Sequence, residues 1–374
     1  MKYYIISGEA SGDLHGSNLI KELKKKDAAA NIRCWGGDMM EAAGATLVKH
    51  YKELAFMGFL EVIKNLGTIL KNIKFCKADI LQYQPTALIL IDYPGFNLRI
   101  AKWAKEQGIP VIYYISPQVW AWKENRVKLI KECVDKMLVI LPFEKEFYKK
   151  WNYEVEYVGH PLVEVVEEFL NKEQGTRNIE QGSKNTIALL PGSRQQEILK
   201  KLPIMLELAK HFPDYEFVVA KAPGLDDSFY AALLAPYKNV SSVVNKTYQL
   251  LVQSKAALVT SGTATLETAL FGVPEVICYK GSAVSYQIAK RLIKIKFIGL
   301  VNLIMDKEVV KELIQDELTV KNLKHELSLL LNDEEKQQQL KTDYALLKNL
   351  LSKGGSASAN AAQSIYSFMI KLPQ

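Results

Sequence analysis

Short apolar segments alternate with longer amphipathic ones along most of the chain. In the first half, runs rich in Val, Ile and Tyr predict strands at Tyr3–Ile6, Ile32–Trp35, Ala87–Ile91, Val111–Ile115, Met137–Val139 and Glu156–Val158. Apolar residues three and four positions apart predict helices at Ser17–Lys26, Leu60–Tyr83, Asn97–Gln107, Glu124–Cys133 and Phe143–Trp151. This alternation is typical of βα units with a parallel sheet, and the wholly apolar segment 87–91 predicts a strand buried on both faces.

The pattern stops and restarts in the middle of the chain. The polar segment Glu167–Lys184 predicts an interdomain linker. Beyond it we expect strands at Thr186–Leu190, Glu216–Ala220, Val240–Val244, Ala257–Thr260 and Glu275–Cys278, a loop at Lys296–Lys307 and a last helix at Ser356–Ile370. The chain is therefore predicted to be α/β, with doubly wound Rossmann-like domains at 1–178 and 179–352 facing a central cleft. The C-terminal helix, within 353–374, is expected to cross back onto the first domain.

Composition narrows the class of protein. The 374 residues are 48% hydrophobic and 24% charged, which excludes a disordered or fibrous chain. Lys and Arg exceed Asp and Glu by 48 to 41, a net charge of +7 that suits an anionic ligand or surface, and we predict no nucleic-acid partner. Four widely spaced cysteines favour a reducing cytosol. No segment reaches the roughly 18 apolar residues that span a membrane, so we expect lipid contact to be peripheral.

The first predicted strand runs into a turn rich in glycine and serine, Ser7–Gly16. It is a candidate binding loop, with Ser7, Glu9, Ser11, Gly12 and Asp13 as its candidate residues. The segment contains no G-x-G-x-x-G pattern, which argues against a nicotinamide enzyme. A tight turn in which Ser11 or Asp13 caps the next helix explains the same residues equally well.

Asp92 follows the buried strand 87–91 directly and is the candidate general base. A carboxylate at an apolar strand end is held in place, and its surroundings tend to raise its pKa. A turn or helix-capping acid is the alternative interpretation.

Two strand-to-helix turns in the second half predict anion binding. The first, Pro191–Arg194, offers Gly192, Ser193 and Arg194, and it lacks the lysine of a P-loop. An ordinary turn with a surface arginine is the alternative interpretation. The second offers Ser261, Gly262 and Thr263, with Glu267 one helical turn later. Glu267 could accept hydrogen bonds from ribose hydroxyls or simply be a favourable acid near a helix start. Two such turns together indicate a diphosphate that carries a sugar.

The remaining candidate features are metal ligands, histidines, tryptophans and stretches that could contact a membrane. There is no Asp-x-Asp motif and no zinc-ligand spacing, so we predict no metal. We expect His15 and His160 to be structural, the alternative being that they donate hydrogen bonds in the cleft loops. We expect Trp120 and Trp122 to pack the loop after 111–115, the alternative being that they stack on a sugar. The apolar cluster Phe56, Met57, Phe59 and Leu60 precedes a helix carrying Lys64, Lys71, Lys74 and Lys77, and Lys290–Lys296 is also basic. These stretches indicate either contact with an anionic bilayer or solvated charged faces over a core stripe.

Together these stretches resemble the lipid-A-disaccharide synthase family over nearly the whole chain. The matching segments are Ser7–Gly16, Met57-Gly58 with Glu61-Val62, Ile91–Asn97, Tyr114–Lys123, Leu141–Tyr148, Gly159-His160, Leu189–Arg194, Ser261–Glu267 and Asn302 to Gln315. The Ser-Pro-Gln-Val-Trp-Ala-Trp and Leu-Leu-Pro-Gly-Ser-Arg motifs are the most specific. The chain departs from the family at Val301, where a proline is common.

The resemblance implies a GT-B glycosyltransferase without metal or other cofactor, peripheral on the cytoplasmic face of the bacterial inner membrane. It would join UDP-2,3-diacylglucosamine to 2,3-diacylglucosamine 1-phosphate. By the same resemblance Asp92 is the base and Arg194 binds the diphosphate. Further cleft residues on the donor side are Asn302, Glu312 and Gln315, and Gln118 belongs to the acceptor side.

Two other functions fit the same sequence features. One is a UDP-sugar epimerase of the same fold, and the other is a non-catalytic sugar-nucleotide or lipid-binding protein. Product analysis separates the three. The sequence is also compatible with a homodimer.

Overall fold

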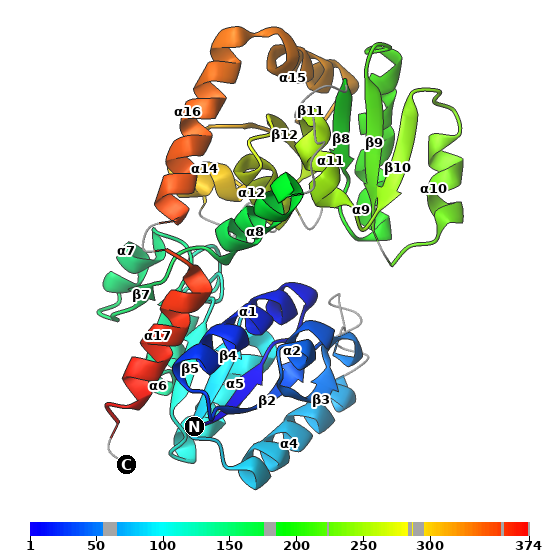
Figure 1. Cartoon of the computed structure of the whole chain (residues 1–374). Helices are drawn as coiled ribbons and strands as arrows, with labels where there is room; N and C mark the ends of the chain where they lie inside the picture. The colour runs from blue at the N-terminus through cyan, green and yellow to red at the C-terminus, as the bar shows by residue number, and fades with distance from the viewer. Residues whose placement is uncertain are drawn as a thin grey trace. The chain divides into compact units, whose positions relative to one another are not determined.

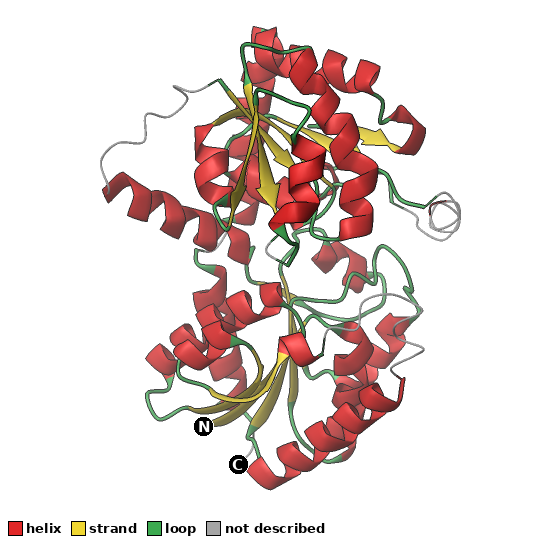
Figure 2. Cartoon of the chain, turned by 90° about the vertical axis from the view of Figure 1, so that its right-hand side faces the viewer, coloured by secondary structure: helices red, strands yellow, loops and turns green. Residues whose placement is uncertain are grey.

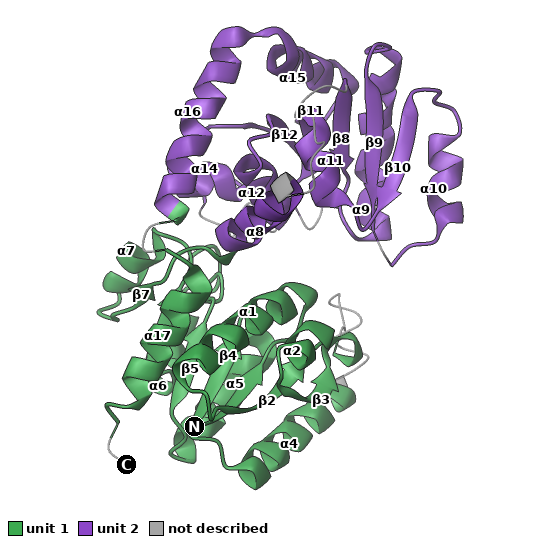
Figure 3. Cartoon of the chain, viewed as in Figure 1, with its two compact units in different colours: residues 1–161, 351–374 green, residues 162–350 purple. Residues whose placement is uncertain are grey.

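The computed structural model describes residues 1–54, 66–175, 185–222, 224–282, 286, 295–352 and 355–372. They form two compact units (Figure 3). Unit 1 comprises Met1–Pro161 with Leu351–Gln374, and unit 2 comprises Leu162–Leu350. Each unit contains one parallel sheet accompanied by helices (Figure 2).

Unit 1 contains a seven-stranded sheet in the order β3-β2-β1-β4-β5-β6-β7 (Figure 1). Its strands are β1 (Lys2–Ile6), β2 (Asn31–Gly36), β3 (Thr46–His50), β4 (Ala87–Ile91), β5 (Val111–Tyr114), β6 (Lys136–Val139) and β7 (Glu156–Tyr157). Its helices are α1 (Ala10–Lys26), α2 (Asp38–Ala42), the 3-10 helix η1 (Tyr51–Glu53), α4 (Leu66–Tyr83), α5 (Pro94–Glu106), α6 (Arg126–Cys133), α7 (Glu144–Lys149) and α17 (Ala357–Met369).

Alternate side chains of these strands form two separate cores. In β1, Tyr3 and Ile5 join the core that contains α1 and α17, whereas Tyr4 and Ile6 join the core that contains α4, α5 and α6. Successive side chains of a strand point to opposite faces, so a strand covered on both sides must be apolar throughout. The prediction for β4 is confirmed, because all five of its residues are fully buried.

Unit 2 contains a six-stranded sheet in the order β10-β9-β8-β11-β12-β13. Its strands are β8 (Thr186–Leu190), β9 (Glu216–Lys221), β10 (Val240–Val244), β11 (Ser254–Thr260), β12 (Glu275–Tyr279) and β13 (Lys311–Ile314). Its helices are α8 (Pro161–Gly175), α9 (Gln195–Leu206), η2 (Glu207–Lys210), α10 (Asp227–Leu234), α11 (Thr247–Gln253), α12 (Thr263–Leu270), α14 (Leu300–Met305), η3 (Gln315–Glu317), α15 (Val320–Asn332) and α16 (Glu334–Leu351). The first residue of α8, Pro161, and the last residue of α16, Leu351, belong to unit 1.

The division into units differs in detail from the predicted boundary at 178/179. Helix α8 continues to Gly175, through the first part of the predicted linker, and Phe169 on this helix contacts Tyr248 and Phe271 of unit 2. The remainder of that linker lies outside the described residues. The C-terminal helix α17 packs on α1 in unit 1 (Figure 1), and its Ala361, Ala362 and Ile365 are fully buried.

Several elements differ from the sequence prediction. Strands β3 and β13 and helix α2 were not predicted, and α14 occupies the expected loop 296–307. Both missed strands lie at sheet edges and carry charged residues, so their apolar pattern is weak. Helix α1 begins at Ala10 rather than Ser17, because its first turns are built from small and polar residues.

No helix among the described residues is long and apolar enough to cross a membrane. The predicted membrane-contact residues Phe56, Met57, Phe59 and Leu60 lie outside the described part of the chain, as do Lys64 and most of Lys290–Lys296.

Candidate active site

In unit 1, the predicted binding loop and Asp92 follow neighbouring strands at the same edge of the sheet. Strands β1 and β4 pair in parallel, with Ile6 opposite Leu90, so their carboxyl ends lie together. The two loops also contact each other. A Cβ atom added to Gly8 would lie 2.4 Å from Cγ of Tyr93, so only glycine fits beneath this ring.

Asp92 is fixed through its main chain. Its φ of 44° is in the left-handed region. Its carbonyl oxygen accepts hydrogen bonds from the Tyr113 hydroxyl at 2.6 Å and from Nδ2 of the buried Asn97 at 2.7 Å. These bonds hold a strained conformation that L-residues rarely adopt, and they fix the main chain from which the carboxyl group extends.

The electrostatic surroundings suit Asp92 to proton transfer near neutral pH. Burial, with a smaller contribution from the charge of Glu9, raises its pKa from 3.8 to about 6, against a hydrogen bond from the Tyr93 N–H. A base with a pKa near the working pH combines a large ionised fraction with a useful proton affinity.

The other candidates in the first loop differ in their roles. Glu9 and Ser11 are exposed at the start of α1. Ser7 is fully buried, and Gly12 approaches it so closely that an added Cβ would lie 2.8 Å from the Ser7 Cβ. Asp13 is buried and accepts hydrogen bonds from the main-chain N–H groups of Gly37, Met39 and Met40 at 2.8, 3.2 and 3.0 Å.

Asp13 therefore caps α2 and not the helix on which it lies, and it joins α1 to the turn after β2. The interpretation of Asp13 as a capping residue applies, but to a different helix from the one expected. Its carboxylate therefore stabilises the fold by holding the start of α2.

The loop after β5 contains Gln118, whose side chain is exposed. Trp120 packs edge-on against Phe143, with ring centroids 4.9 Å apart. Trp122 differs from the expectation that it packs the loop, because it is 48% exposed and the cations of Lys123 and Arg126 lie over its ring.

His15 and His160 are buried. Burial lowers their pKa values to about 4 and about 3, and His15 contributes to the shift at His160. Both imidazoles are therefore neutral at physiological pH, and Nδ1 of His15 is buried without a hydrogen-bond partner in the described structure.

Sequence reasoning missed Glu144, a buried carboxyl that follows β6 near the same sheet edge. Burial raises its pKa to about 8, although its Oε2 accepts a hydrogen bond from the Leu141 N–H at 3.0 Å. Its position shortly after a predicted strand, as with Asp92, was the available signal.

In unit 2, both predicted anion turns follow adjacent strands. Strands β8 and β11 pair in parallel with Leu190 opposite Val259, so the turns that follow them share one sheet edge. Gly192 (φ 106°) and the exposed Ser193 and Arg194 lead into α9. Nη1 of Arg194 donates to Oε1 of Glu197 at 3.0 Å.

The second turn is more firmly tied to its surroundings. The Ser261 hydroxyl donates to the carbonyl of Ile298 at 3.0 Å, while Gly262 and Thr263 are exposed at the start of α12. Glu267 accepts a hydrogen bond from the Tyr248 hydroxyl at 2.7 Å, and burial raises its pKa. The free main-chain N–H groups at the starts of α9 and α12, with the hydroxyl groups beside them, can bind an anion.

Asn302 and Glu312 form a buried network that shapes the neighbouring loop. Oδ1 of Asn302 accepts from the N–H groups of Val309 and Val310, and its Nδ2 donates to the Val310 carbonyl and to Glu312. Glu312 also accepts from the N–H groups of Ile298 and Gly299. All four hydrogen-bonding positions of the Asn302 amide are thus used within the protein.

Gln315 follows β13 and has a left-handed φ of 53°. Its Nε2 is buried without a hydrogen-bond partner in the described structure, and it lies 3.6 Å from the position of a Cβ on Gly281. Gln315 therefore offers an unused donor, whereas the Asn302 amide is satisfied and acts by holding the loop.

The predicted site also omitted Lys201, which lies beneath the Gly192 turn. It is 2% exposed, and its Nζ is 3.6 Å from Oε2 of Glu197. The available signal was a lysine, four residues after a glutamate, at a position of α9 where the helical period predicts an apolar residue.

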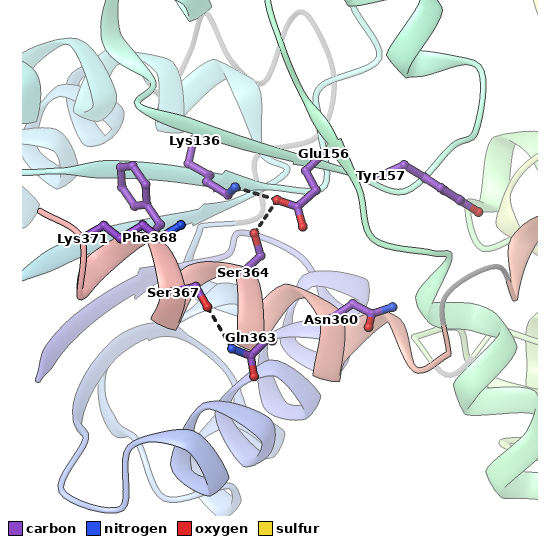
Figure 4. Close-up of a pocket in the computed structure, with 9 residues that line it drawn as sticks. All are labelled: Lys136, Glu156, Tyr157, Asn360, Gln363, Ser364, Ser367, Phe368 and Lys371. Atoms are coloured by element: carbon purple, nitrogen blue, oxygen red, sulfur yellow. Dashed lines mark hydrogen bonds and ion pairs between the residues drawn. The ribbon is translucent and has the colours of Figure 1, made fainter.

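A separate groove of about 570 Å³ lies at the β7 side of the unit 1 sheet, against α17 (Figure 4). Its polar groups bind one another. Nζ of Lys136 and the Ser364 hydroxyl are each 2.6 Å from Oε2 of Glu156, and Gln363 donates to Ser367. The bond from Ser364 to Glu156 fastens α17 to the sheet, and we assign the groove no ligand.

Among the described residues, no group of three or more His, Cys, Asp or Glu side chains is arranged to hold a metal ion. Metal independence stays a prediction from the sequence.

Comparisons with known proteins agree with this architecture. The family model described as lipid-A-disaccharide synthetase matches residues 3–366. A lipid-A-disaccharide synthase of Geobacter metallireducens is 40% identical over 358 residues, covering 94% of this chain and 93% of that protein. One of Nitrosococcus oceani is 39% identical over 360 residues, covering 94% and 92%.

Solved structures show the same GT-B fold. The UDP-GlcNAc 2-epimerase of Neisseria meningitidis, bound to UDP-GlcNAc, superposes with a TM-score of 0.69 at 15% identity, covering 100% of both chains. The calicheamicin glycosyltransferase CalG4 superposes with a TM-score of 0.64 at 17% identity, covering 100% of this chain and 99% of that one. At these identities the likeness concerns the fold alone.

Proposed function

The chain belongs to the lipid-A-disaccharide synthetase family, and from this premise we propose how its residues carry out the transfer. It is a glycosyltransferase that acts on a UDP-sugar and a lipid acceptor. We propose that it moves 2,3-diacylglucosamine from UDP-2,3-diacylglucosamine to the 6-hydroxyl of 2,3-diacylglucosamine 1-phosphate. The products are the β-1,6-linked disaccharide 1-phosphate and UDP.

The observation that carries the mechanism is the state of Asp92, a carboxyl fixed at a strand end with its pKa raised to about 6. In the proposed reaction Asp92 takes the proton from the acceptor hydroxyl as the oxygen attacks the anomeric carbon. The attack comes from the side opposite UDP and inverts that carbon. A positioned base typically contributes about 10²–10⁴-fold to the rate.

The departing diphosphate gains negative charge in this step. We propose that Arg194 and the amino ends of α9 and α12 stabilise it, with Gly192, Ser193, Ser261, Gly262 and Thr263 supplying main-chain and hydroxyl donors. These groups would serve the purpose of a metal ion, and the sequence has no Asp-x-Asp motif to hold one. Gln315 would contact the donor, and Asn302 and Glu312 would keep the loop in place.

We further propose peripheral binding to the cytoplasmic face of the inner membrane, since both sugar substrates carry acyl chains. The net charge of +7 and the apolar cluster Phe56–Leu60 support this placement.

The test is incubation with both acylated sugars in detergent and EDTA, followed by mass spectrometry of the lipid fraction. We expect a tetraacyl disaccharide phosphate. A C2-inverted sugar nucleotide would identify an epimerase, and no product would indicate a binding protein. Loss of activity in EDTA that added metal restores would contradict metal independence.

Two substitutions separate the proposed roles. Asp92→Asn should lower kcat by about 10²–10⁴-fold while UDP affinity is unchanged, because the carboxylate acts on the acceptor. Arg194→Ala should weaken UDP binding, measured by calorimetry. Asp92→Asn with a kcat within a few-fold of wild type, or Arg194→Ala with unchanged UDP affinity, would remove that residue from the mechanism.

A further inference from the structure

A buried lysine lies directly beneath the first anion turn of unit 2. Lys201 occupies the inward stripe of α9 together with the buried Ile198, Leu202 and Met205. Its Nζ is 3.8 Å from the position that a Cβ on Gly192 would take, so the ammonium group lies against the main chain of the turn. A buried ammonium group is costly unless a counter-charge accompanies it.

The counter-charge is Glu197, which is shared between two cations. Its Oε1 accepts a hydrogen bond from Nη1 of Arg194 at 3.0 Å, and its Oε2 is 3.6 Å from Nζ of Lys201. Arg194 is 63% exposed and Lys201 only 2%, so the carboxylate joins a solvent-facing cation to a buried one. Burial lowers the pKa of Lys201, and Glu197 opposes this shift.

We propose that Lys201 is a positioning residue for diphosphate binding, which acts by neutralising Glu197 so that Arg194 can turn from this carboxylate to the ligand. The inference rests on the proposed function, which brings a UDP-sugar to the turn. With Lys201 present the three side chains carry a net charge of +1. Without it they would carry none, and Glu197 would compete with the diphosphate for Arg194 and repel it.

The role is indirect because the Lys201 side chain is only 2% exposed and its ammonium group lies on the Cβ side of Gly192. Gly192 has a φ of 106°, and Oε2 of Glu197 lies 3.4 Å from the position of its added Cβ, so both charged groups lie on one side of this residue. The nearby Thr260 methyl group, 3.5 Å from the same position, completes the packing beneath the turn.

The test is calorimetric titration of the full chain with UDP. Lys201→Met should weaken UDP binding about tenfold or more, equivalent to about 1.4 kcal/mol. Glu197→Gln should bind UDP at least as tightly as wild type. The double variant Lys201→Met/Glu197→Gln should regain affinity to within about threefold of Glu197→Gln, since no carboxylate is left to compete with the ligand. Lys200→Met, an exposed neighbour on α9, is the matched control and should bind as wild type does.

This rescue separates positioning from a structural or a direct role. Unchanged affinity in Lys201→Met would overturn the inference. So would a double variant as weak as Lys201→Met, because the effect would then not pass through Glu197. If Lys201→Met does not fold, as judged by circular dichroism, Glu197→Gln decides, and weaker UDP binding in that variant would overturn the inference. A wild-type chain that binds no UDP would overturn the proposed function and the inference with it.

Discussion

Asp92 shows how a local conformation can prepare a chemical group. Asp92 and Tyr93 both have positive φ, 44° and 49°, an arrangement that costs of order 1–3 kcal/mol per residue. Hydrogen bonds from Tyr113 and Asn97 to the Asp92 carbonyl compensate for this cost. The main chain thus places the Asp92 carboxyl in a buried environment, which opposes its ionisation.

The pH dependence of the reaction should report the Asp92 carboxyl. A general base works when it is unprotonated, so kcat/KM should rise about tenfold per pH unit below pH 6 and level off above it. The measurement is initial rate at low substrate concentration from pH 5 to pH 8. A flat profile between pH 5 and pH 7 would contradict the assignment.

Glu275 is a second buried carboxyl, far from any assigned role. It is the first residue of β12, and neither of its carboxyl oxygens has a hydrogen-bond partner in the described structure. Burial raises its pKa well above 4.5. The unfolded chain ionises this group above about pH 4.3, whereas the folded chain resists ionisation, so stability falls as pH rises through this range.

Replacing Glu275 by Met should therefore stabilise the protein at pH 8, by about 1–3 kcal/mol, because it removes an unsatisfied buried polar group. The gain should shrink towards pH 4, where the glutamate is protonated in both states. Urea titrations at the two pH values measure this, with the exposed Glu335→Met as control. A gain that is the same at both pH values would show that the ionisation of Glu275 does not govern it.

At the scale of elements, the C-terminal helix α17 completes the core of unit 1. Its Ala361, Ala362 and Ile365 are fully buried beside residues of α1 such as Leu19 and Leu23. The chain therefore needs its last helix to bury the first one.

Ile365→Ala should destabilise the protein by about 2–5 kcal/mol, because it leaves a cavity between α17 and α1. The urea midpoint of unfolding, followed by circular dichroism, measures the loss. Gln363→Ala, on the exposed face of the same helix, is the control and should change the midpoint little. Equal midpoints for the two variants would mean that the contact contributes little to stability.

At the scale of the whole molecule, net charge is the property that bears on function. A charge of +7 should attract anionic lipid, and salt screens such attraction over about 10 Å at 0.1 M. We expect the protein to sediment with vesicles that contain phosphatidylglycerol, less so as salt is raised, and not with vesicles of phosphatidylcholine alone. Changing Phe56, Met57 and Phe59 to Ser should reduce sedimentation further. Sedimentation independent of both salt and this cluster would contradict the proposed surface contact.

Most of the architecture could be predicted from the pattern of apolar and polar residues. Every predicted strand corresponds to a strand of the structure, because the strands are short segments rich in Val, Ile and Tyr. The central strand β4 is apolar throughout, because both of its faces are buried. The sequence also singled out Asp92, Arg194 and the turns around Gly192 and Gly262 as candidates, because each of them follows a predicted strand. A parallel sheet brings the residues that follow its strands to one edge.

The contacts of each polar group could not be predicted in this way and became visible in the folded chain. Asp13 caps a helix across a turn, Asn302 is fully hydrogen-bonded to its own loop, and Lys201 reaches Gly192 from beneath. These roles depend on partners brought close by folding, and on burial, which alters the cost of charge. Neither quantity is a property of residue type or spacing, so a sequence pattern predicts which polar residues follow the strands at one edge of a sheet but not which groups these residues contact.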